Sequence, residues 1–274
     1  MTHKITHREI GEGPILVLLH GYGGSVMHWD AVVENLKSDF RVVIPSISHL
    51  FLSQDKIFFS IQIEVLAKFL KENYPQQKVN LAATSYGGAL AWALSIQYPD
   101  LVDRLVLINP MLPHSGIHFI PPELRYFCVT PWTEKGIKVA LATPIGQALI
   151  KKLIAAFRDE RSRSHAPAQK LTGKKLDFVA HLVHNFTWIL HNEDWALWDK
   201  KIIQCLKKPT SMLIYDEQDY LFSGKAYQAF AKNLECLRVV STSGGGHLTI
   251  KTKPEEISQF IKEFIMSEKQ IRVA

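Results

Sequence analysis

A serine in a turn of small residues is the first candidate for chemistry in this chain. Residues 79–83 are apolar except for Asn80, Ser85 follows, and Gly87 and Gly88 lead into apolar residues at helical spacing. This pattern predicts a strand, a sharp turn with Ser85 at its apex, and a helix. Small neighbours permit a strained backbone there, and the hydroxyl would stand at the carboxyl end of the strand, as a nucleophile does. The alternative is a serine that only caps the helix.

Strands and helices alternate around this turn. Further buried strands are expected at residues 15–19, 41–44 and 104–108, and a short edge strand at residues 4–9. Amphipathic helices are expected near residues 27–36 and 63–70. This order predicts an α/β fold with a doubly wound, mostly parallel sheet.

The alternation stops after residue 110. No clear buried strand follows until residue 208, and the helical patches at residues 145–157 and 176–191 are separated by prolines. Strand, helix and strand then resume at residues 211–215, 226–234 and 237–240, and Pro254 opens a closing helix. We therefore predict a single domain over residues 1–274. Its core would be residues 1–112 and 206–274, with an inserted helical cap of about residues 113–205.

Composition limits the class of protein. The chain has 274 residues, of which 47% are hydrophobic, enough for one large core. No apolar run is long enough to cross a bilayer, and no hydrophobic segment typical of a secretory signal occurs near the amino terminus. The cysteines, Cys128, Cys205 and Cys236, are scattered, which favours a reducing compartment; we expect a cytoplasmic protein. The net charge of +6 is spread along the chain without a zinc-finger or RNP-type pattern, which argues against nucleic acid as a partner.

Three motifs each follow a predicted strand. They are His20-Gly21-Tyr22-Gly23-Gly24, then Ala83-Thr84-Ser85-Tyr86-Gly87-Gly88, and finally Gly245-Gly246-His247. In this order they resemble the α/β-hydrolase fold family, and the resemblance covers nearly the whole chain. A helical lid inserted after the strand that ends at Asn109 is similar to the family as well. Each motif alone is a weak signal, whereas all three in order are a strong one.

The resemblance implies a catalytic triad. Ser85 would attack, and His247 would take its proton, because a neutral imidazole titrates close to working pH. A carboxylate must fix the imidazole tautomer; the family pattern favours Asp219, with Asp216 as the fallback. Some relatives carry the acid after the preceding strand, where this chain has the uncharged Asn109. The alternative for the two aspartates is an acidic surface turn.

The resemblance also implies an oxyanion hole. The backbone N–H groups of Tyr22 and Tyr86 would donate to the negative oxygen that develops during attack. The Tyr22 side chain either lines the mouth of the pocket or is buried with its hydroxyl bonded. His20 would prop the loop, since the position of the base is already filled.

The chain departs from the family in three places. Ala83 replaces the first glycine of the turn, a change that packing should tolerate. Residues 45–52 replace an acidic, glycine-rich loop that borders the site in relatives, so we expect a more apolar pocket wall. Ser85 stands where epoxide hydrolases and haloalkane dehalogenases need a carboxylate, which argues against both activities.

Two further features favour structural interpretations. His181, His184 and His191 share a predicted helix, but no cysteine or carboxylate pattern completes a metal site. The basic, amphipathic residues 151–158 favour a solvated helix packed on the core over contact with lipid.

Together these features predict a serine hydrolase that cleaves a carboxylic ester of a small to medium hydrophobic acyl group through an acyl-enzyme. The substrate would be a small molecule, with no cofactor and no stable insertion into a membrane. Two alternatives stay open. The same triad could cleave a carbon–carbon bond of a ring-fission diketone, as hydrolases of the meta-cleavage type do, or the fold could bind a ligand without chemistry. An inert chain should have lost a member of the triad, and this chain retains all three candidates.

Overall fold

A mostly parallel sheet lies at the centre of the computed structural model, which describes residues 4–53, 55–113, 133–148 and 172–267. Within these residues seven strands pair in the order β1-β3-β2-β4-β5-β6-β7. The strands are β1 (His7–Ile10), β2 (Ile15–Leu19), β3 (Arg41–Pro45), β4 (Val79–Thr84), β5 (Val102–Pro110), β6 (Thr210–Asp216) and β7 (Arg238–Thr242). β1 is antiparallel to β3 at one edge, and every other neighbouring pair is parallel. The predicted sheet is confirmed.

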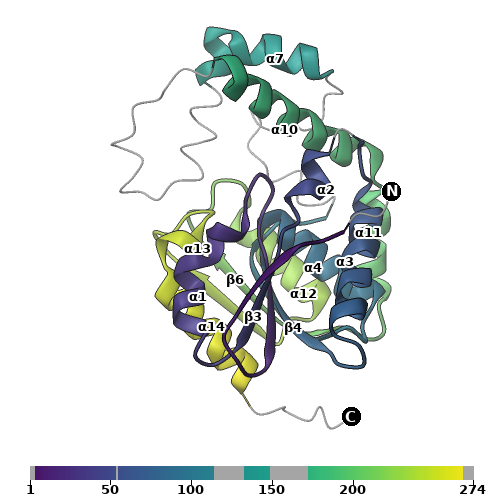
Figure 1. Cartoon of the computed structure of the whole chain (residues 1–274), viewed down its shortest axis with the longest axis vertical. Coiled ribbons are helices and arrows are strands. Elements are labelled where there is room, and N and C mark those ends of the chain that lie inside the picture. Colours follow the sequence, from purple (N-terminus) through teal and green to yellow (C-terminus); the bar gives the residue numbers. More distant parts are fainter. Residues whose placement is uncertain (1–3, 54, 114–132, 149–171, 268–274) are drawn as a thin grey trace.

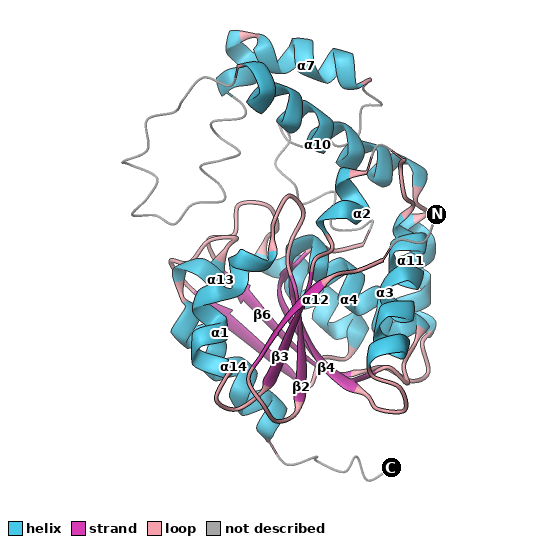
Figure 2. Cartoon of the chain, in the orientation of Figure 1, coloured by secondary structure: helices cyan, strands magenta, loops and turns pink. Residues whose placement is uncertain are grey.

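Helices cover both faces of this sheet (Figure 2). One face carries α1 (Asp30–Leu36), which follows the short helix η1 (Val26–Trp29), together with α13 (Thr249–Thr252) and α14 (Pro254–Met266). The other face carries α3 (Phe59–Asn73), α4 (Ser85–Gln97), α11 (Trp195–Gln204) and α12 (Gly224–Leu234). The other helices within the described residues are α2 (Ser48–Leu52), α7 (Glu134–Ala142) and α10 (Gly173–Asn192).

The sequence of β2 explains how one strand supports both layers. All five of its side chains are buried. Successive side chains of a strand point to opposite faces. Accordingly Leu16 and Leu18 pack with the α1 and α14 side, while Val17 and Leu19 pack with the α3 and α4 side. A strand buried on both faces must be apolar throughout, which is the pattern that predicted it.

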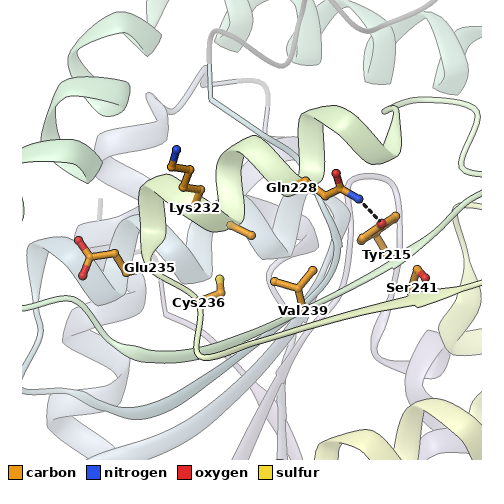
Figure 3. A pocket seen from close by; sticks show the side chains of 8 residues that line it. Tyr215, Gln228, Lys232, Glu235, Cys236, Val239 and Ser241 are labelled. Atoms are coloured by element: carbon orange, nitrogen blue, oxygen red, sulfur yellow. Dashed lines mark hydrogen bonds between the residues drawn. The ribbon is translucent and has the colours of Figure 1, made fainter. Parts of the chain in front are cut away.

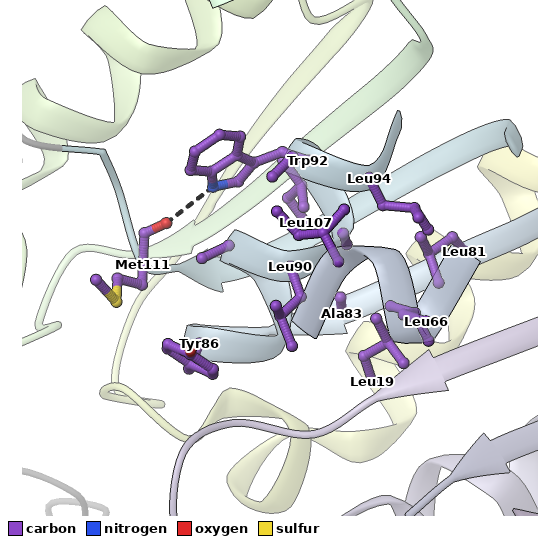
Figure 4. Close-up of a cluster of buried hydrophobic side chains, with 14 of the residues drawn as sticks. Leu19, Leu66, Leu81, Ala83, Tyr86, Leu90, Trp92, Leu94, Leu107 and Met111 are labelled. Carbon is purple, nitrogen blue, oxygen red and sulfur yellow. Dashed lines mark hydrogen bonds between the residues drawn. The ribbon is translucent and has the colours of Figure 1, made fainter. Parts of the chain in front are cut away.

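Helix α4 is apolar around most of its circumference because it lies inside the protein (Figure 4). Ala89, Leu90 and Leu94 are completely buried against the sheet and against α3. Trp92 is also fully buried, and its indole N–H donates to the carbonyl of Met111 at 3.0 Å. The helix that begins at Ser85 is therefore fixed rigidly on the sheet.

The segment between β5 and β6 holds α7, α10 and α11. Figure 1 shows α7 and α10 beyond one end of the sheet, where α10 packs against α2. In contrast, α11 packs against α4 and α12 of the core. Most of the helical patch at residues 145–157 and all of residues 151–158 lie outside the described residues, and the predicted division into core and cap stays a prediction. Among the described helices, none combines the length and the apolar character needed to cross a membrane.

Replacement of Trp92 tests how far α4 depends on its buried face. We expect Trp92→Ala to lower the free energy of unfolding by about 3–5 kcal/mol, because it leaves a large cavity and an unpaired Met111 carbonyl. Urea denaturation measures this change, with the fully exposed Leu206→Ala as the control. A loss below about 1 kcal/mol would show that α4 is held mainly by other contacts.

Candidate active site

Ser85 lies at a strained turn between β4 and α4. Its φ of +54° is in the left-handed region, which costs free energy for a residue with a side chain. The turn is tight: a Cβ on Gly87 would lie 2.4 Å from the carbonyl oxygen of His20, so only glycine fits there. The Ser85 carbonyl accepts a hydrogen bond from the Met111 N–H at 2.8 Å, which fixes the turn to the end of β5. The Ser85 side chain is only partly buried, so its hydroxyl stays within reach of a ligand.

His247 joins Ser85 to Asp219. Its Nε2 lies 2.9 Å from the Ser85 Oγ, and its Nδ1 lies 2.8 Å from the Asp219 Oδ2. The side chains of His247 and Asp219 are both completely buried. A neutral imidazole with its proton on Nδ1 donates to the carboxylate and accepts from the serine hydroxyl. The three predicted residues are thus in hydrogen-bonding contact.

The two aspartates of the predicted turn do different things. The Oδ1 of Asp219 accepts the Leu221 N–H at 2.8 Å, and its Oδ2 accepts the Tyr227 O–H at 2.6 Å in addition to His247. Asp216, the fallback, instead accepts hydrogen bonds through its Oδ2 from the Thr242 hydroxyl and the Gly245 N–H, both at 2.9 Å. Asp216 therefore holds the loop that carries His247, while Asp219 contacts the ring.

Asn109 is a residue of the site that the sequence reasoning set aside as uncharged. Its amide Nδ2 donates to the carbonyls of Gly246 and His247, at 3.1 and 2.9 Å, and to the Thr249 hydroxyl at 3.1 Å. Its Oδ1 accepts the Asp216 N–H at 2.8 Å. Its φ is +41°, a region that asparagine tolerates better than most residues. An asparagine directly after a buried strand was the available signal.

The predicted oxyanion hole lies where β2 and α4 approach each other. A Cβ on Gly21 would lie 2.9 Å from the Ser85 Cβ, so the backbone that leads to Tyr22 runs directly beside the serine. Tyr86 follows Ser85 in the first turn of α4, where backbone N–H groups have no carbonyl partner within the helix. The positive end of the helix dipole lies at the same point and favours negative charge. Whether the two N–H groups act on a substrate stays a prediction.

The side chains of Tyr22 and Tyr86 belong to an aromatic wall that also contains Phe51 and Phe186. The ring of Tyr22 lies 4.6 Å from Phe51, 4.9 Å from Phe186 and 5.4 Å from Tyr86. The Tyr22 hydroxyl donates to the Leu182 carbonyl of α10 at 2.9 Å, and burial raises the pKa of Tyr22. Phe51 comes from residues 45–52, the segment predicted to make the wall apolar. That segment forms α2 at its end, where the sequence reasoning expected a loop.

His20 is buried beside this site in a very different setting. Its Nδ1 donates to the Gly21 carbonyl at 3.0 Å, and its Nε2 has no hydrogen-bond partner among the described residues. A second proton would sit on that buried, unpartnered nitrogen. Burial, with a smaller contribution from the nearby His28, accordingly lowers the pKa of His20 to about 4. The ring is neutral at physiological pH, which suits the predicted structural role.

Two of the predicted helix histidines, His181 and His184, lie close to one carboxylate. His181 Nδ1 lies 3.1 Å from Glu134 Oε2 of α7, and His184 Nδ1 lies 3.6 Å from the same oxygen. Residues 4–53, 55–113, 133–148 and 172–267 contain no group of three or more histidine, cysteine, aspartate or glutamate side chains arranged to hold a metal ion.

A separate pocket of about 450 Å³ lies between α12 and β7 (Figure 3). Tyr215, Gln228, Lys232 and Cys236 contribute to its lining, and burial raises the pKa of the Cys236 thiol to about 11. None of Ser85, Asp219 and His247 lines this pocket. Its size alone therefore does not mark it as the place of the chemistry.

Comparison with known proteins places the chain in the alpha/beta hydrolase fold family. Residues 14–254 match the family model for the alpha/beta hydrolase fold. Epoxide hydrolase 3 from Mus musculus is 24% identical over 279 residues, which cover 93% of this chain and 71% of that protein. A pimeloyl-(acyl-carrier protein) methyl ester esterase from Vibrio vulnificus is 34% identical over 101 residues, 36% of this chain and little more than a third (37%) of that protein. Among solved structures, a thermophilic esterase from Thermogutta terrifontis shares the fold with a TM-score of 0.67 at 17% identity, over 95% of this chain and 92% of that one.

The low pKa of His20 makes stability depend on pH. Below about 6.5 the unfolded chain binds a proton at His20 that the folded protein does not accept until about 4. The contribution of His20 to the free energy of unfolding is therefore fully present above pH 6.5. It is lost as the pH falls toward 4, by about 3 kcal/mol in all. His20→Gln should flatten this part of the curve of unfolding free energy against pH. The exposed His191→Gln is the control; identical slopes for wild type and His20→Gln would contradict the assignment.

Proposed function

Because the chain belongs to the α/β-hydrolase fold family, we propose that it is a serine hydrolase of carboxylic esters with small to medium hydrophobic acyl groups. The observation that carries the proposal is the His247 ring, in contact with the Ser85 Oγ on one side and the Asp219 carboxylate on the other. That arrangement is the one that turns a serine hydroxyl into a nucleophile.

The proposed reaction proceeds in two halves. Ser85 Oγ attacks the ester carbonyl while His247 Nε2 takes its proton, and Asp219 stabilises the imidazolium that forms. The N–H groups of Tyr22 and Tyr86 hold the oxyanion of the tetrahedral intermediate, and each such donor contributes about 3 kcal/mol to lowering the barrier. The intermediate then expels the alcohol, which takes the proton from His247, and the acyl group stays on Ser85. In the second half, water gives a proton to His247 and attacks the acyl carbonyl; the bond to Ser85 Oγ then breaks, His247 returns the proton to Oγ, and the acid is released.

The apolar character of the site supports the choice of acyl group. In the aromatic wall Tyr22 and Phe186 are partly exposed, close to the turn that carries Ser85, and the buried rings of Phe51 and Tyr86 pack behind them. Apolar acyl chains gain free energy from contact with such surfaces. The names of two similar proteins, both esterases, agree with an ester substrate.

The chain is similar to an epoxide hydrolase, but its residues at the site do not favour epoxide opening. Opening an epoxide through a covalent ester needs a carboxylate nucleophile. Ser85 provides a hydroxyl at the apex of the turn, and Asp219 is already engaged by His247. We therefore propose ester cleavage and not epoxide opening.

The cap and the cellular setting are part of the proposal. We propose that α10 belongs to a cap of about residues 113–205 over the site, supported by the Tyr22 hydroxyl on the Leu182 carbonyl and by Asn185 Nδ2 on the Phe51 carbonyl at 3.0 Å. The chemistry needs no cofactor, and the scattered cysteines support a reducing compartment such as the cytoplasm.

Labelling with a fluorophosphonate tests the nucleophile. We expect the wild type to be labelled and to hydrolyse p-nitrophenyl butyrate, and Ser85→Ala to do neither. Asp219→Asn should lower kcat by about 10⁴-fold, because the imidazole loses the carboxylate that orients it. Glu217→Gln, an exposed neighbour in the same turn, is the matched control. A folded wild type that is not labelled would favour a protein that binds without chemistry, and turnover of a ring-fission diketone without any ester would favour carbon–carbon cleavage.

A series of p-nitrophenyl esters tests the acyl preference. We expect kcat/KM to rise from acetate to hexanoate by about threefold per methylene, since each buried methylene contributes up to about 0.8 kcal/mol. Phe186→Ala should move the optimum to longer chains because it removes part of the aromatic wall. The exposed Phe178→Ala, also on α10, serves as the control. A preference for acetate in both the wild type and Phe186→Ala would contradict an apolar acyl site.

A further inference from the structure

The mechanism above does not use Tyr227, which lies deep inside the protein on α12. Its side chain is completely buried. Its hydroxyl donates to the Asp219 Oδ2 at 2.6 Å. This is the same oxygen that lies 2.8 Å from the His247 Nδ1, so two donors share one carboxylate oxygen.

The direction of the Tyr227 hydrogen bond follows from its surroundings. Burial, and then the negative charge of Asp219, raise the pKa of Tyr227 well above its ordinary value. The phenol therefore keeps its proton and donates it, while the carboxylate accepts. Hydrogen bonds of this kind, from a neutral donor to an ionised acceptor, are shorter and stronger than neutral ones.

Packing leaves the Tyr227 ring little freedom to turn away. The ring of Tyr215 stacks on it, with 5.5 Å between centroids and 23° between planes, and Phe222 meets its edge at 5.9 Å. Tyr215 is held in turn by the Gln228 side chain, which donates to its hydroxyl at 2.9 Å (Figure 3). The Tyr227 hydroxyl is thus fixed on Asp219 before any substrate binds.

Two donors on one oxygen compete for its charge. Charge that Asp219 shares with Tyr227 is less available to stabilise the protonated His247 ring. We propose that Tyr227 is a positioning residue of the triad: through Asp219 it sets how readily His247 gives up its proton, and it extends activity to lower pH. This inference rests on the proposed function, because it assumes that His247 is the base.

Other titratable groups contact the same assembly. Asp216, on β6, faces Tyr227 and adds to the rise in its pKa, but its Oδ2 is directed at Thr242 and Gly245. Tyr215, also on β6, contacts Tyr227 through its ring and places its hydroxyl on Gln228. The other titratable groups in this assembly are His247 and Asp219, which contact each other. Within these contacts, Tyr227 is the phenol that reaches the Asp219 carboxylate.

The test is the pH profile of kcat/KM for p-nitrophenyl butyrate. In Tyr227→Phe, Asp219 keeps its bonds to His247 and Leu221 and holds the imidazolium more strongly. The acid limb of the profile should therefore move to higher pH by about one unit, with KM unchanged. Tyr215→Phe is the matched control: it removes the neighbouring hydroxyl, which does not contact Asp219, and should leave the limb where it is in the wild type.

A second variant moves the effect in the opposite direction. Site-specific incorporation of 3-fluorotyrosine at position 227 makes the phenol a stronger hydrogen-bond donor. The acid limb of the pH profile should then move to lower pH. This variant tests the inference if Tyr227→Phe does not fold. The inference is overturned if the acid limb stays in place in Tyr227→Phe, or if it moves in the same direction in both variants. Either result leaves the hydrolase proposal intact. A wild type without ester hydrolysis or fluorophosphonate labelling overturns both.

Discussion

The position of His247 depends on buried polar side chains that hold its loop, chiefly those of Asn109 and Asp216. The loop after β7 has no regular structure of its own between Thr242 and Thr249, yet His247 must lie within hydrogen-bond distance of a serine on another strand. Asn109, at the end of β5, donates to the backbone of this loop and accepts from the first residue of the acidic turn. Buried backbone groups need partners, so the amide, together with the Asp216 carboxylate, holds both loops in place. The contact between His247 and Ser85 follows from that arrangement.

A second constraint is the close approach of β2 to the start of α4. Gly87 lets the helix lie against the His20 carbonyl, and Gly21 lets the next turn lie against the Ser85 side chain. The strained backbone of Ser85 persists because the helix behind it is buried on every side, so relaxing the turn would separate α4 from the sheet. Strain at the nucleophile is thus maintained by packing elsewhere, and it keeps the partly buried hydroxyl accessible at the end of the strand.

The site also shows how environment assigns different tasks to the same residue type. His20 and His247 are both buried, but His20 has one hydrogen-bonded nitrogen and His247 has partners on both sides of its ring. A proton added to His20 would have no acceptor, whereas a proton added to His247 would sit on Nε2 and face the Ser85 Oγ, with the Asp219 carboxylate at the opposite nitrogen of the charged ring. Asp216 and Asp219 differ in the same way, because one carboxylate binds backbone and hydroxyl donors of its loop and the other binds an imidazole.

The sequence alone determined the parallel sheet and pointed to Ser85 and His247, because apolar runs and glycine-rich turns are local signals and their order along the chain can be read directly. It could not determine Asn109 or Tyr227, since neither residue carries a pattern that points to a partner more than a few positions away; the Asn109 contacts span more than a hundred residues. The sequence also did not decide which of Asp216 and Asp219 contacts His247. The turn between them, closed by the Asp219 N–H on the Asp216 carbonyl, places the Asp219 carboxylate against the ring. Only the folded chain brings the ends of β4, β5, β6 and β7 to one edge of the sheet, and hydrogen bonds between loops exist only once the strands are paired.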